Sequence, residues 1–542
     1  MSENEKIEGH GGQLALAGLK AFGVKELFTL SGGHVFPLYD AAHQTGVKIV
    51  DVRHEQSAVF AAEAVAKLQR RPGLAVLTAG PGVTNGVSGV TSAYFNGAPV
   101  IVLGGRAPLF RWGSGSLQEI DHVPLLAPVT KHAATVNSAD DIADALRHAA
   151  LTALSPHRGP VFLDLPLDVI YNNGTATIPA VSTVEVVEPD PDEVARAAAL
   201  LAAAQRPVII AGSDVYAGDA TAALREAAES LTIPVFTNGM GRGSLPPSHP
   251  LAFTKARRAA LKGADVVAVI GTPLDFRLNF GDFGEAQVVH IVDAPGQRAT
   301  HVRTAVSPAG DLRLILSAIA DHRGVRADHT DWVSQLRQVE DAARAAEVAE
   351  IEADTDPIKP GRVYGELRKI LEPDAVTIGD GGDFVSYAGR YLEPSQPGTW
   401  LDPGPYGCLG TGMGYALGAR VTYPDRQICV LLGDGAAGFS LMDAETLVRL
   451  KLPVVIICGN NGIWGLEKHP MKALYGYDVA ADLQPGLRYD AVVEALGGAG
   501  ETVAKPGDLA PALRRAFDAG VPYLVNVLTD PEDQYPRSSN LA

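Results

Sequence analysis

The chain has 542 residues, which is too long for one hydrophobic core and predicts about three to four domains. Its 46% apolar and 20% charged residues are typical of a folded globular protein, and a net charge of -17 without a basic cluster argues against a nucleic-acid surface. The three cysteines (Cys408, Cys429 and Cys458) lack CxxC spacing, so we expect neither a disulfide framework nor a zinc site. The N-terminal residues are polar and no apolar run is long enough to cross a bilayer, so we expect neither a secretory signal nor a membrane span. Together these features predict a cytoplasmic location.

The first segment, residues 1–180, alternates short β-branched runs with Gly-rich turns and Ala-rich helical stretches. This alternation predicts a parallel sheet covered by helices. Residues 175–192 contain turn formers without a helical period and predict a linker. The expected strands are KELFTL, KIVDV, LAVLTAG, PVIVLGG and PVFLDLP.

The same alternation returns in residues 190–345 and 355–542. Residues 329–357 between these segments predict an exposed helix that ends near Pro357. We therefore expect an α/β fold with three doubly wound parallel-sheet domains, whose ligands lie beyond the carboxyl ends of the strands. The expected strands are RPVIIAGSD, IPVFTN, DVVAVIG and VVHIVD in the second segment, and AVTIGDGG, QICVLLGDG, PVVIICGNN and PYLVNVLTD in the third.

Two polar motifs follow neighbouring buried strands of the third segment. Asp434 lies in the GDG turn after one strand, and Asn461 ends the next strand with Asn-Asn. The Asp434 carboxylate, the Asn461 amide oxygen and the Ile463 carbonyl would give Mg²⁺ three protein oxygens, with diphosphate and water completing its shell. Each motif alone could be a simple turn, but their spacing after two buried strands favours a site.

At this spacing the motifs resemble the thiamin diphosphate (ThDP) signature, in which NN follows GDG after about thirty residues. The resemblance to ThDP-dependent decarboxylases and acetolactate synthases covers essentially the whole chain. It implies a pyrimidine-binding domain (1–180), a middle domain (190–345) and a diphosphate-binding domain (355–542). It also implies ThDP and Mg²⁺ as cofactors and at least a homodimer, with a homotetramer expected, because in relatives two subunits share each site.

The resemblance assigns cofactor roles to individual residues. Glu55 matches the glutamate that activates the pyrimidine ring, although a lone Glu at a helix start could instead stabilise the helix dipole. Leu409 matches the apolar wedge that bends ThDP, with Met413 as its competitor, and the Gly407 carbonyl would accept a hydrogen bond from the cofactor amino group. The residues expected around the diphosphate are Gly382, Asp383, Gly433, Asp434, Gly435, Ala436, Asn461 and Gly465.

Three further residues bear on the reaction. His34 lies in a glycine turn after the first strand, and Gln118 matches a glutamine of acetolactate synthases and 2-hydroxyacyl-CoA lyases. Glu467 lies six residues after Asn461, where pyruvate decarboxylases carry an acid and acetolactate synthases do not. It could transfer a proton at the reacting carbon, or simply pair with Lys468. His34 could equally be an exposed loop residue.

The middle domain and the C-terminal tail resemble parts of CoA-dependent relatives. The middle domain would hold an adenine nucleotide, ADP rather than FAD, unless it has lost its ligand. The polar tail LTDPEDQYPRSSNLA could fold over a CoA thioester as a lid, with Arg537 on a phosphate, or fray. The expected nucleotide contacts are Arg158, Gly212, Ser213, Arg277 and Asp293.

These features favour a 2-hydroxyacyl-CoA lyase, which cleaves the C1–C2 bond of its substrate to formyl-CoA and an aldehyde or ketone. The alternative is an acetolactate synthase-type carboligase that acts on 2-oxo acids such as pyruvate. A catalytically silent ThDP-fold subunit is disfavoured, because Glu55, Asp434 and Asn461 are all present.

Overall fold

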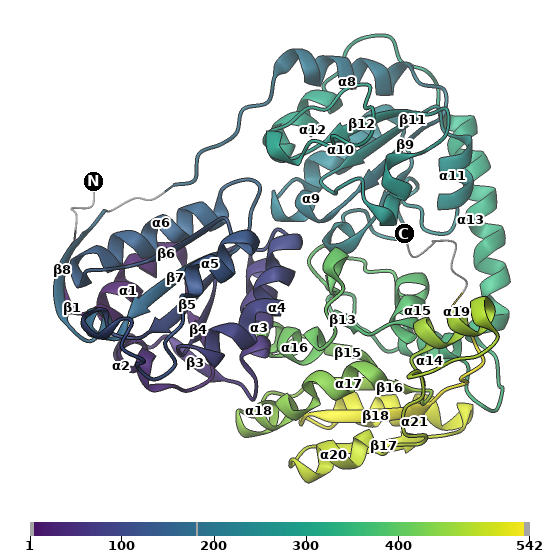
Figure 1. Ribbon diagram of the computed structural model, residues 1–542. Helices are drawn as coiled ribbons and strands as arrows, with labels where there is room; N and C mark the ends of the chain where they lie inside the picture. Colours follow the sequence, from purple (N-terminus) through teal and green to yellow (C-terminus); the bar gives the residue numbers. More distant parts are fainter. Residues whose placement is uncertain (1–4, 180–182, 536–542) are drawn as a thin grey trace.

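The computed structural model describes residues 5–179 and 183–535, which form three α/β units. Figure 1 shows the first unit in purple and blue, the middle unit in teal and the third in green to yellow, each built on its own sheet. The predicted fold class, α/β with three parallel-sheet domains, is confirmed. Within the described residues, no helix has both the length and the apolar character needed to cross a bilayer.

The first and third sheets share one topology. The first-unit sheet has the order β3-β2-β4-β5-β7-β6, and the third-unit sheet has the order β14-β13-β15-β16-β18-β17. The first unit contains β2 (Glu26–Thr29), β3 (Lys48–Asp51), β4 (Gly73–Leu77), β5 (Val100–Arg106), β6 (His132–Thr135) and β7 (Val161–Pro166). The third contains β13 (Val376–Asp380), β14 (Trp400–Leu401), β15 (Ile428–Gly433), β16 (Val455–Asn460), β17 (Ala499–Val503) and β18 (Tyr523–Leu528).

The middle sheet begins in the same way, with the order β10-β9-β11-β12. In all three sheets, the strand that comes first in the chain has the second strand on one side and the third on the other. A gap between loops therefore opens at the carboxyl ends of the first and third strands, which is where open α/β sheets bind ligands. The middle strands are β9 (Pro207–Ala211), β10 (Val235–Thr237), β11 (Val266–Ile270) and β12 (Gln287–Ile291).

Every strand expected from a continuous apolar run forms, including the edge strands β3, β10 and β12, whereas the edge strands β6, β14 and β17 were not predicted. β6 and most of β17 are only half-buried, so they lack the apolar runs of central strands. β1 (Glu5–His10) and β8 (Asn173–Ile178) form a separate antiparallel pair. The linker is consequently shorter than predicted, because β8 occupies residues 175–178 and α8 (Pro191–Ala203) begins at Pro191.

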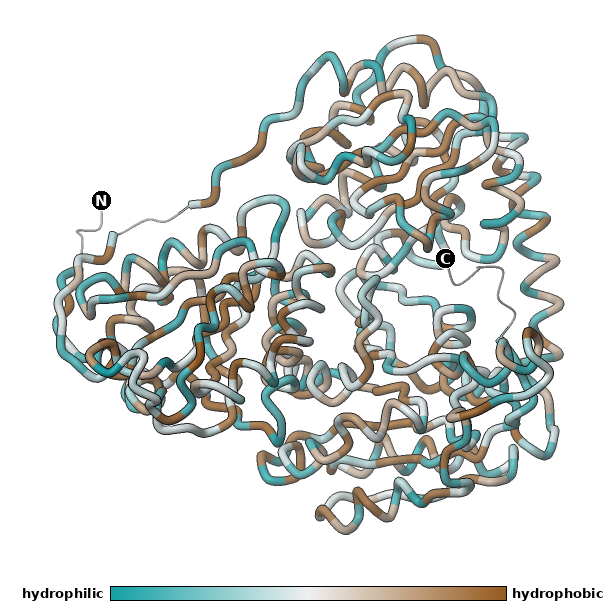
Figure 2. The backbone as a smooth tube through the Cα atoms, viewed as in Figure 1, coloured by the Kyte–Doolittle hydropathy of each residue, from teal (hydrophilic) through white to brown (hydrophobic). Residues whose placement is uncertain are grey.

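The hydrophobic stretches of the chain run through the interior of each unit, where Figure 2 shows brown tube along the strands. Helix α13 (Thr330–Ile351) connects the middle unit to the third along one side of the molecule (Figure 1). It ends before the predicted Pro357, and it is not fully exposed, because Trp332, Leu336 and Ile351 are buried. The helix therefore joins the two units through packed contacts.

Helices α3 (Glu55–Gln69) and α16 (Thr411–Thr422) pack the first unit against the third. Two glycines of α16 allow the close approach. A Cβ atom at Gly418 would lie 2.3 Å from the Ala61 carbonyl oxygen, and one at Gly414 would lie 2.6 Å from the Phe60 Cβ. Both distances are too short for real contacts, so the helix spacing depends on glycine.

We expect Gly418→Ala to lower the free energy of unfolding by about 1–3 kcal/mol, because the added methyl group must push α16 away from α3. Urea unfolding followed by circular dichroism measures the change. The matched control is Gly507→Ala in helix α21 (Pro506–Asp518), where a Cβ meets open space. The control should leave stability unchanged or raise it by up to about 1 kcal/mol. Equal stability of the two variants would contradict the prediction.

Candidate active site

A cavity lies at the carboxyl ends of β13, β15 and β16, and all of its lining residues belong to the third unit. Its empty volume is about 380 Å³. Glycines line much of it, which leaves backbone N–H groups accessible to a ligand. The structure brings the following expected diphosphate, metal and catalytic residues together here: Gly382, Asp383, Gly433, Asp434, Gly435, Ala436, Asn461, Ile463, Gly465 and Glu467.

Asp434 is the first residue of helix α17 (Asp434–Ser440) and is only 4% exposed. Its two carboxylate oxygens accept hydrogen bonds from the N–H groups of Gly435, at 2.9 Å, and Gly462, at 2.7 Å. Burial raises the pKa of Asp434 to about 6, although these backbone hydrogen bonds oppose the shift. In the described part of the chain no basic side chain forms an ion pair with it. Asp434 is therefore a buried acid whose oxygens can accept further hydrogen bonds and which, among the described residues, has no basic partner.

Asn461 and Ile463 follow β16 on a loop that the backbone holds in place. The Ile463 N–H donates to the Asn461 side-chain oxygen at 3.2 Å. The Trp464 N–H donates to the Ala481 carbonyl at 2.8 Å, which anchors the loop to a later segment. The cavity thus gathers the Asp434 carboxylate, the Asn461 amide oxygen and the Ile463 carbonyl oxygen, and this set of oxygen ligands fits Mg²⁺.

Two positions in this cavity require glycine. A Cβ atom at Gly435 would lie 2.5 Å from the Trp464 ring, and one at Gly382 would lie 2.7 Å from the Leu466 side chain. Gly382 precedes helix α15 (Asp383–Tyr391), and Gly435 is the second residue of α17. Both helices therefore begin at the cavity, so free N–H groups and the positive ends of two helix dipoles favour an anionic diphosphate there.

The segment expected to bend the cofactor lies just before α16. Gly407 has the left-handed conformation, with φ 72°, and Leu409 is half-buried. Met413 has no exposed surface and belongs to the hydrophobic core, so it is not available as a wedge. Leu409 remains the candidate.

How this segment is held was not evident from the sequence. Asp380, a fully buried residue at the end of β13, accepts hydrogen bonds from the N–H groups of Gly410, at 3.1 Å, and Gly412, at 2.8 Å. Burial raises the pKa of Asp380 to about 7, and the two backbone donors oppose the shift.

The pyrimidine-side candidates gather at the carboxyl edge of the first sheet. Glu55 begins α3, is 6% exposed and accepts a hydrogen bond from the Asn85 side chain at 3.0 Å. His34 is buried, and its Nδ1 lies 3.3 Å from the Thr78 hydroxyl. Gln118 has a φ of 60° and packs against Gly80, where a Cβ would lie 2.8 Å from the Gln118 Cβ. β2, β3 and β4 and the loop after β5 thus bring all three candidates to one edge.

A buried network that the sequence did not indicate supports this edge. His122 accepts a hydrogen bond from the Gly80 N–H at 3.0 Å and its other ring nitrogen lies 3.0 Å from Asp164. Arg106 pairs with the same carboxylate at 2.5 Å. Burial lowers the pKa of His34, and the nearby His122 lowers it further, so His34 is neutral at pH 7.

A cleft that residues of all three units line lies at the carboxyl ends of β9, β11 and β12 of the middle sheet. Of the expected nucleotide contacts, Arg158, Ser213 and Arg277 line it. Asp293 is buried beside it and binds His157 Nδ1 at 3.0 Å. Gly212 is required by packing, because a Cβ there would lie 2.3 Å from the Thr272 Cβ. The structure therefore places all five residues at one switch point.

His157 and Asp214 add charge to this cleft. Burial lowers the pKa of His157, but Asp214 and Asp293 raise it more strongly, to about 9. The side chain is therefore a cation at neutral pH, paired with the buried Asp293 and the half-buried Asp214. Sequence reasoning missed both residues, because their pairing joins the first unit to the middle one.

The described end of the tail packs on the third unit. Asp533 accepts a hydrogen bond from the Tyr387 hydroxyl, and the Tyr535 ring meets the Tyr387 ring edge-on at 5.1 Å. Arg537, the expected phosphate contact, lies outside the described residues.

Comparison with known families matches each unit separately. Residues 9–125 match the thiamine pyrophosphate enzyme N-terminal TPP binding domain, residues 194–319 match the central domain, and residues 380–527 match the C-terminal TPP binding domain. The chain is 51% identical to a probable acetolactate synthase of Mycobacterium bovis and to the acetolactate synthase large subunit IlvG of Mycobacterium tuberculosis, over 98% of each chain.

More distant relatives carry a different name. The chain is 36% identical to 2-hydroxyacyl-CoA lyase 2 of Caenorhabditis elegans, over 92% of this chain and 85% of the relative. It is 33% identical to the human 2-hydroxyacyl-CoA lyase 2, over 96% and 90%. These similarities support the acetolactate synthase alternative better than the lyase that the sequence motifs favoured. With its three matching domains and near full-length relatives, the chain belongs to the thiamine pyrophosphate enzyme family.

Proposed function

We propose that this chain is a ThDP- and Mg²⁺-dependent carboligase of the acetolactate synthase type, which acts on 2-oxo acids such as pyruvate. The observation that carries the proposal is the 51% identity to acetolactate synthases over 98% of both chains. The cavity around Asp434 supports it, because its acid, amide and backbone groups suit a metal-bound diphosphate. When bound, ThDP supplies an electron sink for a bond that breaks or forms beside a carbonyl.

Each candidate residue then has a specific task. Asp434 and Asn461 hold Mg²⁺ through their side-chain oxygens, and Ile463 does so through its carbonyl. Leu409 orients the bound cofactor by contact with its rings. Glu55, whose side chain is buried, would hold a proton toward the pyrimidine ring of the bound cofactor.

We also propose that the active enzyme is at least a homodimer, and a homotetramer as a pair of such dimers. The diphosphate cavity is lined by the third unit alone, whereas Glu55, His34 and Gln118 lie on the first unit. In this chain, α3 packs on α16, and no described residue of the first unit lines the Asp434 cavity. The first unit of a partner would complete it.

A second candidate function is a 2-hydroxyacyl-CoA lyase. Glu467 favours it, because this exposed acid lines the cavity in the first turn of helix α19 (Gly465–Tyr475), where it can exchange a proton with a substrate hydroxyl. The relatives named 2-hydroxyacyl-CoA lyase 2 share most of the chain length with it. In either function, His34 and Gln118 face the substrate from the first unit.

One experiment separates the two functions. The purified protein is supplied with ThDP and Mg²⁺ and incubated with pyruvate in one arm and with a 2-hydroxyacyl-CoA in the other. Acetolactate and CO₂ from pyruvate, without thioester cleavage, are the expected result. Formyl-CoA release with no acetolactate would establish the lyase instead, and failure to take up ThDP would overturn both.

We expect Glu467→Gln to lower kcat of the lyase reaction by about 10²-fold or more, because the amide cannot exchange a proton with the substrate hydroxyl. ThDP affinity should change less than about twofold, since the backbone of the cavity is untouched. Steady-state kinetics and calorimetric titration with ThDP measure the two effects. Glu494→Gln, in helix α20 (Tyr489–Ala495) outside the cavity, is the matched control. A kcat equal to that of the control would remove Glu467 from the reaction.

A further inference from the structure

Asp380 connects two parts of the candidate active site. It is the last residue of β13, and its side chain is fully buried. Its Oδ1 accepts a hydrogen bond from the Gly410 N–H at 3.1 Å, and its Oδ2 accepts one from the Gly412 N–H at 2.8 Å. Across residues 5–179 and 183–535, no basic side chain pairs with this carboxylate. The two backbone N–H groups therefore satisfy its buried oxygens.

The backbone just after Asp380 lines the diphosphate cavity. Gly381 and Gly382 both border this cavity beside Gly433. The turn fits closely against the next strand, because a Cβ atom at Gly381 would lie 3.1 Å from the Gly433 nitrogen. One short turn thus makes two contacts: its backbone borders the cavity, and its carboxylate holds the start of α16.

The segment that Asp380 holds is the one proposed to contact the cofactor rings, through the Gly407 carbonyl and the Leu409 side chain. Gly407 and Gly410 both have left-handed backbone conformations, with φ values of 72° and 86°. Leu409 lies between them and is only half-buried. The hydrogen bonds to Asp380 follow Leu409 directly, so they fix the point where the backbone leaves this turn and enters α16.

A carboxylate suits this position better than an amide of the same shape. It offers one oxygen to each of two donors, whereas an amide offers one oxygen and turns its NH₂ group toward the other donor. Glycine is needed opposite it, since a Cβ atom at Gly412 would lie 2.9 Å from the Asp380 Cβ. The N-cap of α16 makes no side-chain hydrogen bond of its own. A cap for the helix alone needs no residue from a separate strand, so what Asp380 adds is the link to the cavity.

The elements around Asp380 keep the carboxylate in a fixed place. β13 pairs with β14 on one side and with β15 on the other, where Asp380 lies opposite Leu432. The next helix, α15, is held at its start, because the Tyr364 hydroxyl donates to the Phe384 carbonyl at 2.6 Å. Tyr364 is itself fully buried.

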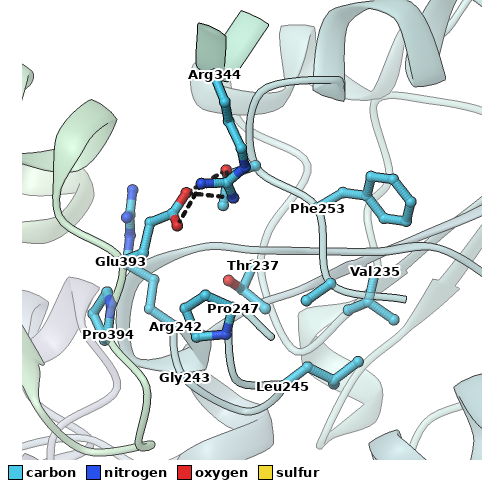
Figure 3. A pocket seen from close by; sticks show the side chains of 12 residues that line it. Val235, Thr237, Arg242, Gly243, Leu245, Pro247, Phe253, Arg344, Glu393 and Pro394 are labelled. Atoms are coloured by element: carbon cyan, nitrogen blue, oxygen red, sulfur yellow. Dashed lines mark hydrogen bonds and ion pairs between the residues drawn. The ribbon is translucent and has the colours of Figure 1, made fainter. Parts of the chain in front are cut away.

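The far end of α15 is anchored to the rest of the molecule by an ion pair. Figure 3 shows Glu393, two residues beyond the helix, facing Arg344 of α13. Two guanidinium nitrogens lie 2.9 Å from the two Glu393 oxygens, and the Thr254 hydroxyl donates to the same carboxylate at 2.7 Å. A side chain that positions others must itself be held by its surroundings, and β13 and α15 meet this condition for Asp380.

We propose that Asp380 is a positioning residue that sets the Gly407 carbonyl and the Leu409 side chain at a fixed distance from the diphosphate cavity. The inference rests on the proposed function, because it takes both groups as contacts of ThDP. It goes beyond that function by assigning the geometry of the bound cofactor to a buried acid that does not line the cavity. A shift of about 1 Å in this segment would leave the diphosphate bound but misalign the rings, which can lower the rate by about 10²-fold.

The test compares the wild type with Asp380→Asn, which keeps the shape of the side chain but loses one acceptor. Calorimetric titration in the presence of Mg²⁺ measures the ThDP affinity. Exchange of the thiazolium C2 proton of bound ThDP for deuterium, followed by NMR after acid quenching, measures activation of the cofactor without any substrate. We expect the affinity to change by less than about threefold, and both the exchange rate and kcat to fall by at least about 50-fold.

Asp311→Asn is the matched control. Asp311 caps helix α12 (Leu312–Ala320) of the middle unit in the same way, through the N–H groups of Arg313, at 2.8 Å, and Leu314, at 3.4 Å. Both variants should unfold at a lower urea concentration than the wild type, but only Asp380→Asn should slow the C2 exchange. An exchange rate in Asp380→Asn equal to that of the wild type, or the same loss in both variants, would overturn the proposal and leave Asp380 a helix cap.

A measurement on the wild-type apo protein does not depend on the folding of any variant. Amide hydrogen exchange should be at least about tenfold slower at Gly410 and Gly412 than at the exposed Gly407, because a buried carboxylate holds the first two before any cofactor binds. Unprotected amides at these two positions would also overturn the proposal. A wild type that takes up no ThDP contradicts the proposed function, whereas normal uptake with unchanged C2 exchange in Asp380→Asn contradicts this inference alone.

Discussion

Asp434→Asn is expected to abolish Mg²⁺-dependent uptake of ThDP and to lower turnover by at least about 100-fold, because a neutral amide cannot replace the anionic ligand of a divalent cation. Asp434 is the buried acid to which the Gly435 and Gly462 N–H groups point, and it has no cationic partner in the described chain. Calorimetric titration of the apo protein with ThDP, with and without Mg²⁺, measures the effect directly.

The same substitution should leave the apo protein folded. It costs one backbone hydrogen bond but removes a carboxylate whose pKa is raised by burial to about 6. The raised pKa means that the folded apo protein disfavours the charged carboxylate. The free energy of unfolding therefore falls as pH rises from about 4 to 6, and it stays at this lower value above pH 6. We therefore expect the unfolding free energy of the variant at pH 7 to lie within about 1 kcal/mol of the wild type. Asp508→Asn, on an exposed position of α21, is the control for the change of residue type. ThDP binding that survives in Asp434→Asn would show that the metal lies elsewhere.

Glu55→Gln should separate cofactor binding from catalysis. The glutamine oxygen can still accept the Asn85 hydrogen bond, so the start of α3 should keep its structure. It cannot exchange a proton, and the loss of that step lowers kcat by about 10²–10⁴-fold. Kinetics combined with ThDP titration would show a loss of turnover with unchanged affinity. Turnover equal to that of the wild type would exclude Glu55 from the reaction.

A mixture of the two variants tests whether two chains share each site. If Glu55 of one copy serves the Asp434 cavity of its partner, a heterodimer of Glu55→Gln and Asp434→Asn has one intact site and one site with both changes. Random exchange of subunits would then restore about a quarter of wild-type activity, because half of the dimers are mixed and each has one working site. No recovery after subunit exchange would mean that each chain builds its own site.

The shared topology of the three sheets gives these experiments a common structural basis. In the third unit, Gly382 and Asp434 follow the first and third strands, at the switch point of the sheet. In the middle unit, Ser213 follows the first strand. The strand order explains why these residues, rather than others on the same loops, lie close together.

Much of the fold and of the cofactor site could be predicted from the sequence. The central strands are contiguous apolar runs buried on both faces, so short stretches of chain determine them. The Asp434 and Asn461 motifs follow neighbouring strands, and parallel strands necessarily bring their carboxyl ends to one edge. Local hydrophobicity and the geometry of a parallel sheet therefore suffice to predict that the two residues lie together.

Other features depend on contacts between distant segments, and only the tertiary structure decided them. β1 and β8 pair across the whole first unit, and Met413 is removed from the candidate site by packing in the core. Asp380 holds the N–H groups of Gly410 and Gly412 although a separate strand carries it. Such arrangements follow from how the units close on one another, because side chains far apart in the chain acquire neighbours, burial and shifted charges only when the packed interfaces form.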